Sequence, residues 1–504
     1  MTSRLVQPLE GRAMLSGLLP VGAPGVRGDG DRLEILVRPS QITSRPVPAV
    51  LVKDINRGPA DSINMPWLPK SPRSEMAAVG GAVLFGADDG RHGFTLWRSD
   101  GTPGGTRIVR PKLGDIEQFT SLAGTLFFVR NGRELWRSDG TNRGTTRVKG
   151  FAAPRQNESG YDSLSILGTF NGSLVMQYGR RLWTSNGGAA GTRLLRDLGP
   201  TAGDIDEITA AGGQFFFAES RPRSGATRLW ASDGTSDGTK VVRKIRGDLS
   251  HFDVVGDSVL FSRIPPGNAD PQTWISDGTP GGTHASPWRF DSSVLFNHRI
   301  YFIQADDPTA MYSRHSLWAA DETLTARNPV KTFPKGDEAF TMGPAYDGAV
   351  YFALDDGEHG VELMKTDGTQ EGTVLVKDIH RGGLGSYPRN FSMVNGNLLF
   401  TAYDGIRGAG IWSTTGTPDE TRPAKVLTSG GYVDVNYLFT SGTAVYITTV
   451  DGKVWRSDGT SAGTKAIGDF NGGRLSPTKF TSAGPHVFFF ALEDAHGAEL
   501  WMEP

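Results

Sequence analysis

The chain of 504 residues is predicted to be all-β and to consist of about ten copies of a four-stranded sheet. Three observations lead to this prediction. A tryptophan recurs at steps of 39 to 48 residues, the segment after it keeps the pattern DGTxxGT, and each repeat breaks into four short strand-like runs. A period of about 45 residues is typical of the four-stranded blades of a β-propeller, which we therefore expect.

The repeated tryptophans mark the third strand of each unit. Nine of the eleven tryptophans occupy this position, and a methionine takes it in one unit. The ten positions are Trp97, Trp136, Trp183, Trp230, Trp274, Trp318, Met364, Trp412, Trp455 and Trp501. Because one anchor per repeat is what a repeated core needs, we expect these side chains to pack between sheets rather than to stack on a ligand.

Residues 389–427 show what one unit contains. Asn395–Gly396 separates its first two runs, and Asn-Gly favours a two-residue hairpin because both residues tolerate positive φ. Similar pairs recur at Asn171–Gly172, Gly212–Gly213, Gly256–Asp257 and Asp347–Gly348. The second run, for example residues 487–491, is apolar at consecutive positions, so both faces of each sheet should be buried.

The DGTxxGT segment is interpreted as a structural turn between the third and fourth runs. Its first position is held by Asp100, Asp139, Asp233, Asp277, Asp321, Asp367 and Asp458, whereas Asn186 and Thr415 replace the aspartate in two units. A short oxygen-bearing side chain can accept backbone N–H groups within a turn. Repetition in so many units favours a role in the fold over a role in catalysis, and the units at 318–327 and 412–421 should have different turns.

The two ends of the chain predict how the ring closes. The last unit stops at LWMEP after its third strand, and the missing strand type occurs at the start, where AVLVKDI (49–55) matches VLVKDI (374–379). We expect the first strand to complete the last blade, which removes two open sheet edges. Residues 49–504 then form one propeller, with two five-bladed propellers as the alternative, and residues 1–48 form a flexible leader or an export or sorting segment.

The repeats resemble a known family. ELWRSDGT (134–141) and ELMKTDGTQEGTVLVKDI (362–379) resemble the bacterial ELWxxDGTxxGT repeat of large secreted or surface proteins. The resemblance implies a propeller-like repeat domain without an established general catalytic role. LEGRAMLSG (9–17) resembles the LEPR-type N-terminal segment of bacterial surface proteins, with Gly11 in place of proline, and implies export to the cell surface or beyond. The turns are also similar to the structural Asp-box hairpins of sialidase-type propellers.

Composition excludes several classes of function. A net charge of −2 gives no field that would favour nucleic acid or an anionic membrane. The absence of cysteine excludes disulfides, thiol catalysis and cysteine-bound metals. No run reaches the roughly 18 apolar residues that a membrane-spanning helix needs. HExxH, Gx4GK[ST], GxSxG and a GxGxxG between a strand and a helix are not evident, so we expect a monomeric binding protein rather than an enzyme, although a glycosidase needs no linear motif.

Irregular loops mark the expected binding face. In a blade, the connections between strands 2 and 3 and those between blades emerge on one side, whereas the DGTxxGT turns emerge on the other. Arginine, tyrosine and histidine in these irregular loops would suit carboxylates, sugars or acidic peptide. The candidate ligand-binding residues are Arg221, Arg223, Tyr312, Arg314, His315, His380, Arg381, Tyr387 and Arg389.

Acidic loops provide a calcium hypothesis. Asp88, Asp89, Asp355 and Asp356 could supply carboxylate oxygens, but no EF-hand spacing or nonapeptide calcium repeat is present. Histidines in the same hairpins, His92, His359 and His496, are interpreted as turn residues. Three hypotheses therefore remain open: a non-catalytic extracellular module that binds a glycan, a peptide or a surface protein, a polysaccharide-active enzyme, and a calcium-stabilised structural repeat.

Overall fold

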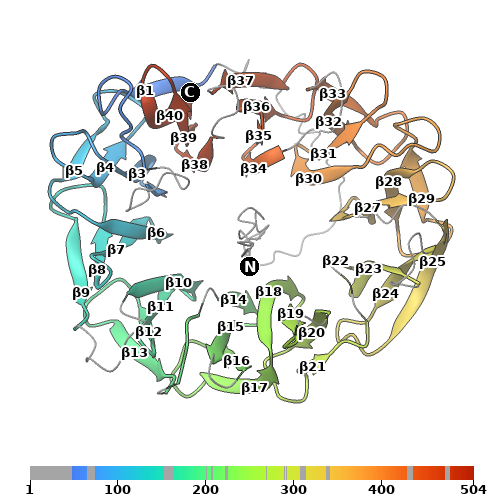
Figure 1. Cartoon of the computed structure of the whole chain (residues 1–504), viewed down its shortest axis with the longest axis horizontal. Helices are drawn as coiled ribbons and strands as arrows, with labels where there is room; N and C mark the ends of the chain where they lie inside the picture. The colour runs from blue at the N-terminus through green and yellow to red at the C-terminus, as the bar shows by residue number, and fades with distance from the viewer. Residues whose placement is uncertain are drawn as a thin grey trace, which may run out of the picture.

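Ten four-stranded antiparallel sheets stand side by side in one ring in the computed structural model, the arrangement of a ten-bladed β-propeller (Figure 1). The structure describes residues 48–64, 74–152, 163–199, 201–205, 208–221, 225–267, 270–288, 290, 292–306, 314–335, 341–427, 435–470 and 477–504. Within these residues there is no helix, and so none that could cross a bilayer. The predicted ten-bladed ring is confirmed, and the alternative of two five-bladed propellers is wrong.

Blade 1 comprises β2 to β5, the numbering continues in chain order to blade 9 (β34 to β37), and blade 10 combines β38 to β40 with β1. The innermost strands are β2 (Met76–Val79), β6 (Ile116–Leu122), β10 (Leu164–Phe170), β14 (Thr209–Ala211), β18 (Asp248–Val255), β22 (Ser293–Phe296), β26 (Thr341–Tyr346), β30 (Arg389–Val394), β34 (Val435–Ser441) and β38 (Thr478–Ala483). The second strands are β3 (Ala82–Ala87), β7 (Thr125–Arg130), β11 (Ser173–Tyr178), β15 (Gln214–Arg221), β19 (Ser258–Ile264), β23 (Arg299–Ala305), β27 (Ala349–Asp355), β31 (Asn397–Tyr403), β35 (Ala444–Thr449) and β39 (His486–Glu493). The third strands are β4 (Thr95–Ser99), β8 (Glu134–Ser138), β12 (Arg181–Ser185), β16 (Ala226–Ser232), β20 (Gln272–Ser276), β24 (Arg314–Ala320), β28 (Val361–Thr366), β32 (Ala409–Thr414), β36 (Lys453–Ser457) and β40 (Gly497–Glu503). The outermost strands are β5 (Arg107–Arg110), β9 (Thr146–Gly150), β13 (Thr192–Asp197), β17 (Lys240–Arg246), β21 (His284–Ala285), β25 (Arg327–Lys335), β29 (Val374–Lys377), β33 (Arg422–Val426), β37 (Lys465–Asp469) and β1 (Val50–Lys53).

The core lies between neighbouring blades. One cluster joins Val83 and Phe85 of blade 1 to Phe488 and Leu500 of blade 10, and every residue of β3 is buried. Because each sheet covers apolar side chains of the sheets on both sides, its second strand needs no polar face. This arrangement confirms the expectation drawn from the consecutive apolar runs.

The repeated tryptophans pack as core anchors, as predicted. Trp136 stacks on Phe128 with ring centroids 6.3 Å apart, and Trp230 stacks on Phe217 at 5.7 Å. In each case the phenylalanine is the direct cross-strand partner on the second strand. Aromatic pairs in this position add to the free energy gained by burying their surface.

Each DGTxxGT turn is closed by a repeated set of hydrogen bonds. In blade 1 the Asp100 carboxylate accepts from the Thr102 amide (3.1 Å) and hydroxyl (2.8 Å), and these bonds hold the pKa of Asp100 below its usual value. The Ser99 and Thr106 hydroxyls bond each other at 2.8 Å. Asp139, Asp233, Asp277, Asp367 and Asp458 make the same two bonds to the threonine two residues later.

The two divergent units have different turns, as expected. Asp321 accepts from the amides of Thr323, Thr325 and Ala326. In the other unit the Thr415 hydroxyl bonds the Glu420 carboxylate. Both turns therefore keep an acidic acceptor, although in the second unit the acid comes from the far end of the turn.

The turns also join neighbouring blades. A basic residue on an outermost strand donates to the carbonyl of the threonine that closes the next blade's turn: Lys53 to Thr106 at 2.8 Å, Lys331 to Thr373 at 2.7 Å and Lys377 to Thr421 at 2.8 Å. Arg110 makes the same bond to Thr145 at 2.6 Å. The conformation of one turn thus positions an acceptor for the neighbouring sheet.

The ring closes through strands from opposite ends of the chain. β1 pairs antiparallel with β40, with Val50 opposite Met502 and Leu51 opposite Trp501. Both strands lie in blade 10 in Figure 1. The predicted closing strand is confirmed, whereas the proposed leader at 1–48 lies outside the described residues except for residue 48.

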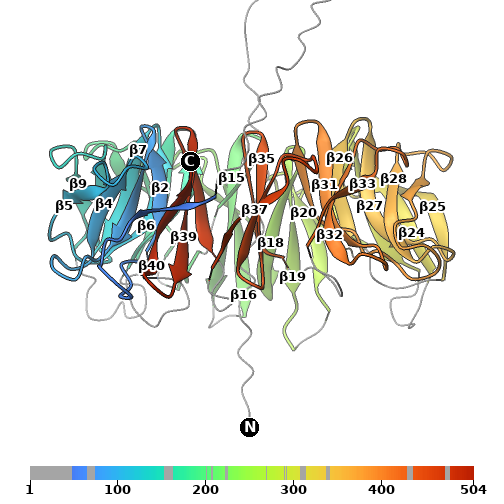
Figure 2. The same cartoon turned by 90° about the horizontal axis from the view of Figure 1, so that it is seen from above.

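The antiparallel order of each sheet gives the ring two different faces, seen edge-on in Figure 2. We call the face that carries the hairpins between strands 1 and 2 and the DGTxxGT turns the turn face. The opposite face carries the hairpins between strands 2 and 3 and the connections between blades, and we call it the loop face. The candidate ligand-binding residues that the structure describes belong to the loop face or to the strand ends next to it.

The turn predicts different effects of substitution at two adjacent glycines. A Cβ on Gly105 would overlap the Asp100 carboxylate, whereas a Cβ on Gly104 would meet nothing within 4 Å. We expect Gly105→Ala to lower the free energy of unfolding by roughly 1–3 kcal/mol, and Gly104→Ala to leave it within about 0.5 kcal/mol. Thermal denaturation of both variants measures this difference, and equal melting temperatures would refute the proposed packing.

Candidate functional site

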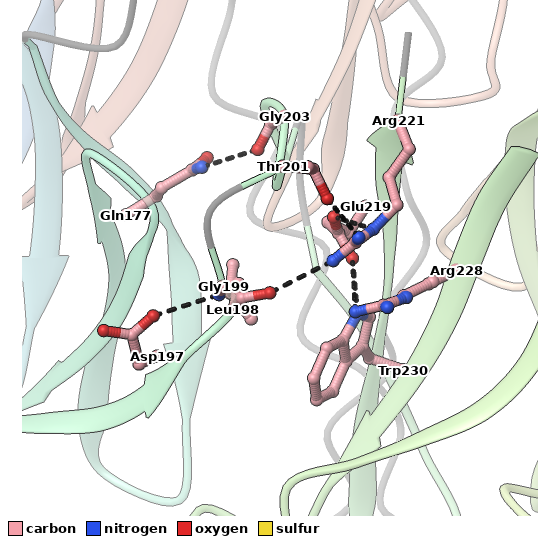
Figure 3. A network of polar contacts seen from close by, with 10 residues as sticks. All are labelled: Gln177, Asp197, Leu198, Gly199, Thr201, Gly203, Glu219, Arg221, Arg228 and Trp230. Carbon is pink, nitrogen blue, oxygen red and sulfur yellow. Dashed lines mark hydrogen bonds and ion pairs between the residues drawn. The ribbon is translucent and has the colours of Figure 1, made fainter. Parts of the chain in front are cut away.

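The loop-face residue Arg221 lies in a network between blades 3 and 4 (Figure 3). Its Nε donates to Glu219 at 2.8 Å, its Nη2 donates to the Leu198 carbonyl at 3.1 Å, and its Nη1 bonds the Thr201 hydroxyl. The side chain of Arg221 is only 15% exposed. The guanidinium therefore ties the connection between β13 and β14 to the second strand of blade 4.

Glu219 is the buried centre of this network. Its carboxylate also accepts from Trp230 Nε1 at 3.2 Å and lies 3.9 Å from Arg228. Burial raises the pKa of Glu219, and the hydrogen bonds from Trp230 and Arg221 and the charges of Arg221 and Arg228 counteract that rise. A carboxylate with these partners is a structural acceptor, because its oxygens are already occupied by buried donors.

Blade 2 contains the same network with the two charges exchanged. Arg130 and Glu134 face each other across β7 and β8, 2.9 Å apart, whereas in blade 4 the acid lies on the second strand and Arg228 on the third. In both blades the carboxylate accepts from the repeated tryptophan, here Trp136 at 3.0 Å. In these two blades the acid that accepts from the tryptophan can therefore come from either the second or the third strand.

A second arrangement, which we call the clamp, holds the connection after β29. The buried Glu362 accepts from the His380 amide (2.9 Å), the Ser386 amide (3.1 Å) and the Ser386 hydroxyl (2.5 Å). The His380 ring contacts the Gly385 carbonyl at 3.2 Å and packs edge-on against Tyr403, with centroids 5.3 Å apart. One carboxylate thus fixes both ends of the loop at 380–386.

The clamp recurs between blades 10 and 1. Glu499 accepts from the Asn56 amide at 3.3 Å and from the Ser62 hydroxyl at 2.6 Å. Asn56 takes the place of His380, and its side-chain amide donates to the Asp61 carbonyl at 3.2 Å. Because asparagine replaces histidine in this copy, the imidazole of His380 is not required for the clamp.

Both clamp glutamates are fully buried, with 0% of their surface exposed. Burial raises the pKa of Glu362 to about 7 and that of Glu499 to about 8, despite the hydrogen bonds from serine and backbone amides that oppose the rise. The nearby carboxylates of Asp378 and Asp54 raise the two values further. Each glutamate can therefore be neutral in the folded protein at pH values where it is ionised in the unfolded chain.

The remaining candidate ligand-binding residues fall into separate places. Arg314 forms an ion pair with Asp306 at 3.3 Å, and the buried His315 lies beside Arg314 on β24 of blade 6. His380, Arg381, Tyr387 and Arg389 belong to the connection between blades 7 and 8 and the strand that follows it. Arg223 and Tyr312 lie outside the described residues. Four of the candidate ligand-binding residues thus lie in one segment after β29, whereas Arg221 lies in blade 4 and the pair on β24 lies in blade 6.

The acidic hairpins use their carboxylates locally. Asp89 accepts from the Arg91 and His92 amides and contacts His92 Nδ1 at 2.7 Å. In the same way Asp356 accepts from the Glu358 and His359 amides and contacts His359 Nδ1 at 2.8 Å. Asp88 and Asp355 each accept from the glycine two residues later. These bonds confirm that the histidines are turn residues. In the described part of the chain, no three His, Asp or Glu side chains group as a metal site would need, so calcium remains a prediction.

Sequence reasoning missed Glu219, Glu362 and Glu499. The last two occupy the glutamate position of the ELW motif, two residues before Met364 and Trp501, and this shared position was the available signal. Glu219 had no such signal, because its partner Arg228 is opposite it only once β15 and β16 are paired.

No protein-family profile and no curated protein sequence matches the chain. Solved structures resemble it only distantly. BamB from Moraxella catarrhalis is 15% identical over 68% of this chain and 97% of its own, and Sqt1 from Saccharomyces cerevisiae is 11% identical over 68% and 96%, each with a TM-score of 0.37. The computationally designed Ika8 protein is 13% identical over 67% of this chain and 95% of its own, also at 0.37. At these values the likenesses give no information about the ligand.

The clamp predicts a specific dependence of stability on pH. A glutamate in an unfolded chain has a pKa of about 4.3, so a raised folded value stabilises the protein fully below pH 4, and this contribution is lost as the pH rises through 7 to 8. A glutamine has the shape of the neutral acid, with one oxygen for the amides and an NH2 group that can donate to the serine hydroxyl. We expect the double variant Glu362→Gln with Glu499→Gln to match the wild-type melting temperature near pH 5. Near pH 8.5 it should melt a few degrees higher than the wild type, because its free energy of unfolding is then greater by on the order of a few kcal/mol.

Thermal denaturation at both pH values tests this expectation. The single variant Glu371→Gln, an exposed change in a DGTxxGT turn on the turn face, provides a control for the general effect of removing an acid. A double variant that is destabilised equally at both pH values would show that the two glutamates are ionised in the folded state.

Proposed function

We propose that this propeller is a non-catalytic binding module that recognises an extracellular glycan, peptide or surface protein through its loop face. The observation that supports this proposal most strongly is that four glutamates on the loop face already have structural partners. Glu134 and Glu219 are paired with arginine, and Glu362 and Glu499 hold connections between blades. A glycosidase needs two carboxyl groups that can reach the scissile bond, whereas these acids are occupied in the fold.

The loop after β29 offers an exposed recognition group on this face. Arg381 is exposed and has no hydrogen-bond or ion-pair partner among the described residues. A guanidinium held on an anchored loop can bind a carboxylate through two hydrogen bonds. An extracellular location is part of the proposal and rests on the resemblance of residues 9–17 to a surface-protein segment.

Binding and turnover can be separated in one experiment. The full chain is incubated with a panel of bacterial polysaccharides and with a library of random peptides, and both retention and release of reducing ends or cleaved peptide are measured. We expect retention without product. Arg381→Ala should weaken binding about tenfold, because a charge-assisted hydrogen bond contributes about 1.5–3 kcal/mol.

Arg143→Ala is the matched control, because Arg143 is also exposed but lies in a DGTxxGT turn on the opposite face. It should bind as the wild type does. Product released by the wild-type chain would contradict the proposal in favour of a polysaccharide-active enzyme, and equal losses in the two variants would contradict the assignment of the loop face.

A further inference from the structure

The two copies of the clamp allow a comparison within one molecule. Residues 54–63 of the first copy align with 378–387 of the second, and their hairpins at 88–93 align with 403–408. Asp89 and Asp404 accept from the same amides of these hairpins and contact the side chain three residues later. Differences between the copies at exposed positions are therefore not required by the clamp.

Two such differences replace small or charged residues with large apolar ones. Leu384 stands where the first copy has Ala60, and Ile406 stands where it has Arg91. Ile406 is 87% exposed and Leu384 69% exposed, whereas the other exposed large apolar side chains in the described residues range from 38% to 50%. The two most exposed apolar side chains of the described structure thus occur in the same copy of the clamp.

Contacts through His380 connect the two positions. Its ring contacts the carbonyl of Gly385, the neighbour of Leu384, and a Cβ on Gly405, the neighbour of Ile406, would overlap the same ring. The Tyr403 amide donates to the Ser386 carbonyl at 2.9 Å. The loop and the hairpin are therefore joined side by side, with the His380 ring between Gly385 and Gly405.

This surface is held in place before any partner binds. Glu362 fixes the loop at His380 and Ser386, and the Tyr387 amide donates to the Val361 carbonyl at 3.0 Å. A rigid apolar surface loses little conformational entropy when a partner covers it. Such preorganisation favours a specific partner.

Building on the proposed function, we propose that Leu384 and Ile406 form a docking site for a polypeptide segment that carries two large apolar side chains and a carboxylate for Arg381. A Cβ added to either of the glycines at 382 and 383 would meet nothing within 4 Å, so the partner's main chain can approach the loop closely. An anionic bilayer fits less well for two reasons. The exposed Glu358 is two residues before Gly360, which lies against the loop at Gly383 and Gly385, and Asp404 already neutralises Arg407 at 2.7 Å.

The first copy of the clamp supplies the variant that tests this site. Leu384→Ala with Ile406→Arg introduces the residues that the equivalent clamp already carries, so the fold should tolerate it. The probe is a phage-displayed library of random twelve-residue peptides, selected on the full chain. We expect enriched peptides that contain two large apolar residues and an acid, and that bind the double variant at least tenfold more weakly than the wild type.

The reciprocal change, Ala60→Leu with Arg91→Ile, should create a second site and raise the peptide stoichiometry from one to two in titration calorimetry. Selected peptides that bind the double variant as tightly as the wild type overturn this inference. If those same peptides are weakened by Arg381→Ala, the proposed function stands while this site fails. If no peptide is enriched and vesicles of phosphatidylcholine and phosphatidylglycerol retain the wild type but not the double variant, the surface contacts lipid and the inference is overturned.

Discussion

Closure of the ring is the constraint on which the rest of the structure depends. Each blade buries apolar side chains on both faces, so a blade without a neighbour on either side would expose a core cluster to water. Pairing of β1 with β40 gives blade 10 its fourth strand and places both ends of the repeat in one sheet. The sequence near residue 50 therefore supports the folding of a sheet whose other strands lie more than 420 residues later.

The polar residues of the repeat serve this closed ring in two ways. On the turn face, aspartate and glycine shape a turn whose threonine carbonyl accepts from the next blade. On the loop face, glutamates bind the connections through their amides and serine hydroxyls. Most motif residues are thus occupied in holding the fold, and the residues proposed for recognition, Arg381, Leu384 and Ile406, lie outside these motifs. A repeated framework with local departures explains how this fold can acquire a ligand without changing its core.

Much of the fold could be predicted, because its determinants repeat along the chain. The tryptophan spacing locates the blades, and the match between residues 49–55 and 374–379 identifies the closing strand. The candidate site was less predictable, because partners in different strands and loops decide what a side chain does. Arg221 has the composition of a ligand-binding residue but is taken up by Glu219 and the Leu198 carbonyl. Leu384 and Ile406 stand out only when two copies of the clamp are compared position by position and their exposure is known.

The closing strand can be tested directly, because the chain contains no cysteine. Val50→Cys with Met502→Cys places two thiols at paired positions of β1 and β40, whereas Val50→Cys with Val254→Cys places the second thiol on β18, across the ring (Figure 1). A short bismaleimide should link the first pair within one chain at native pH and should not link the second, as mass spectrometry of the digested monomer would show. Absence of the intramolecular link in the first variant, or equal linking in both, would contradict a single ring closed by its first strand.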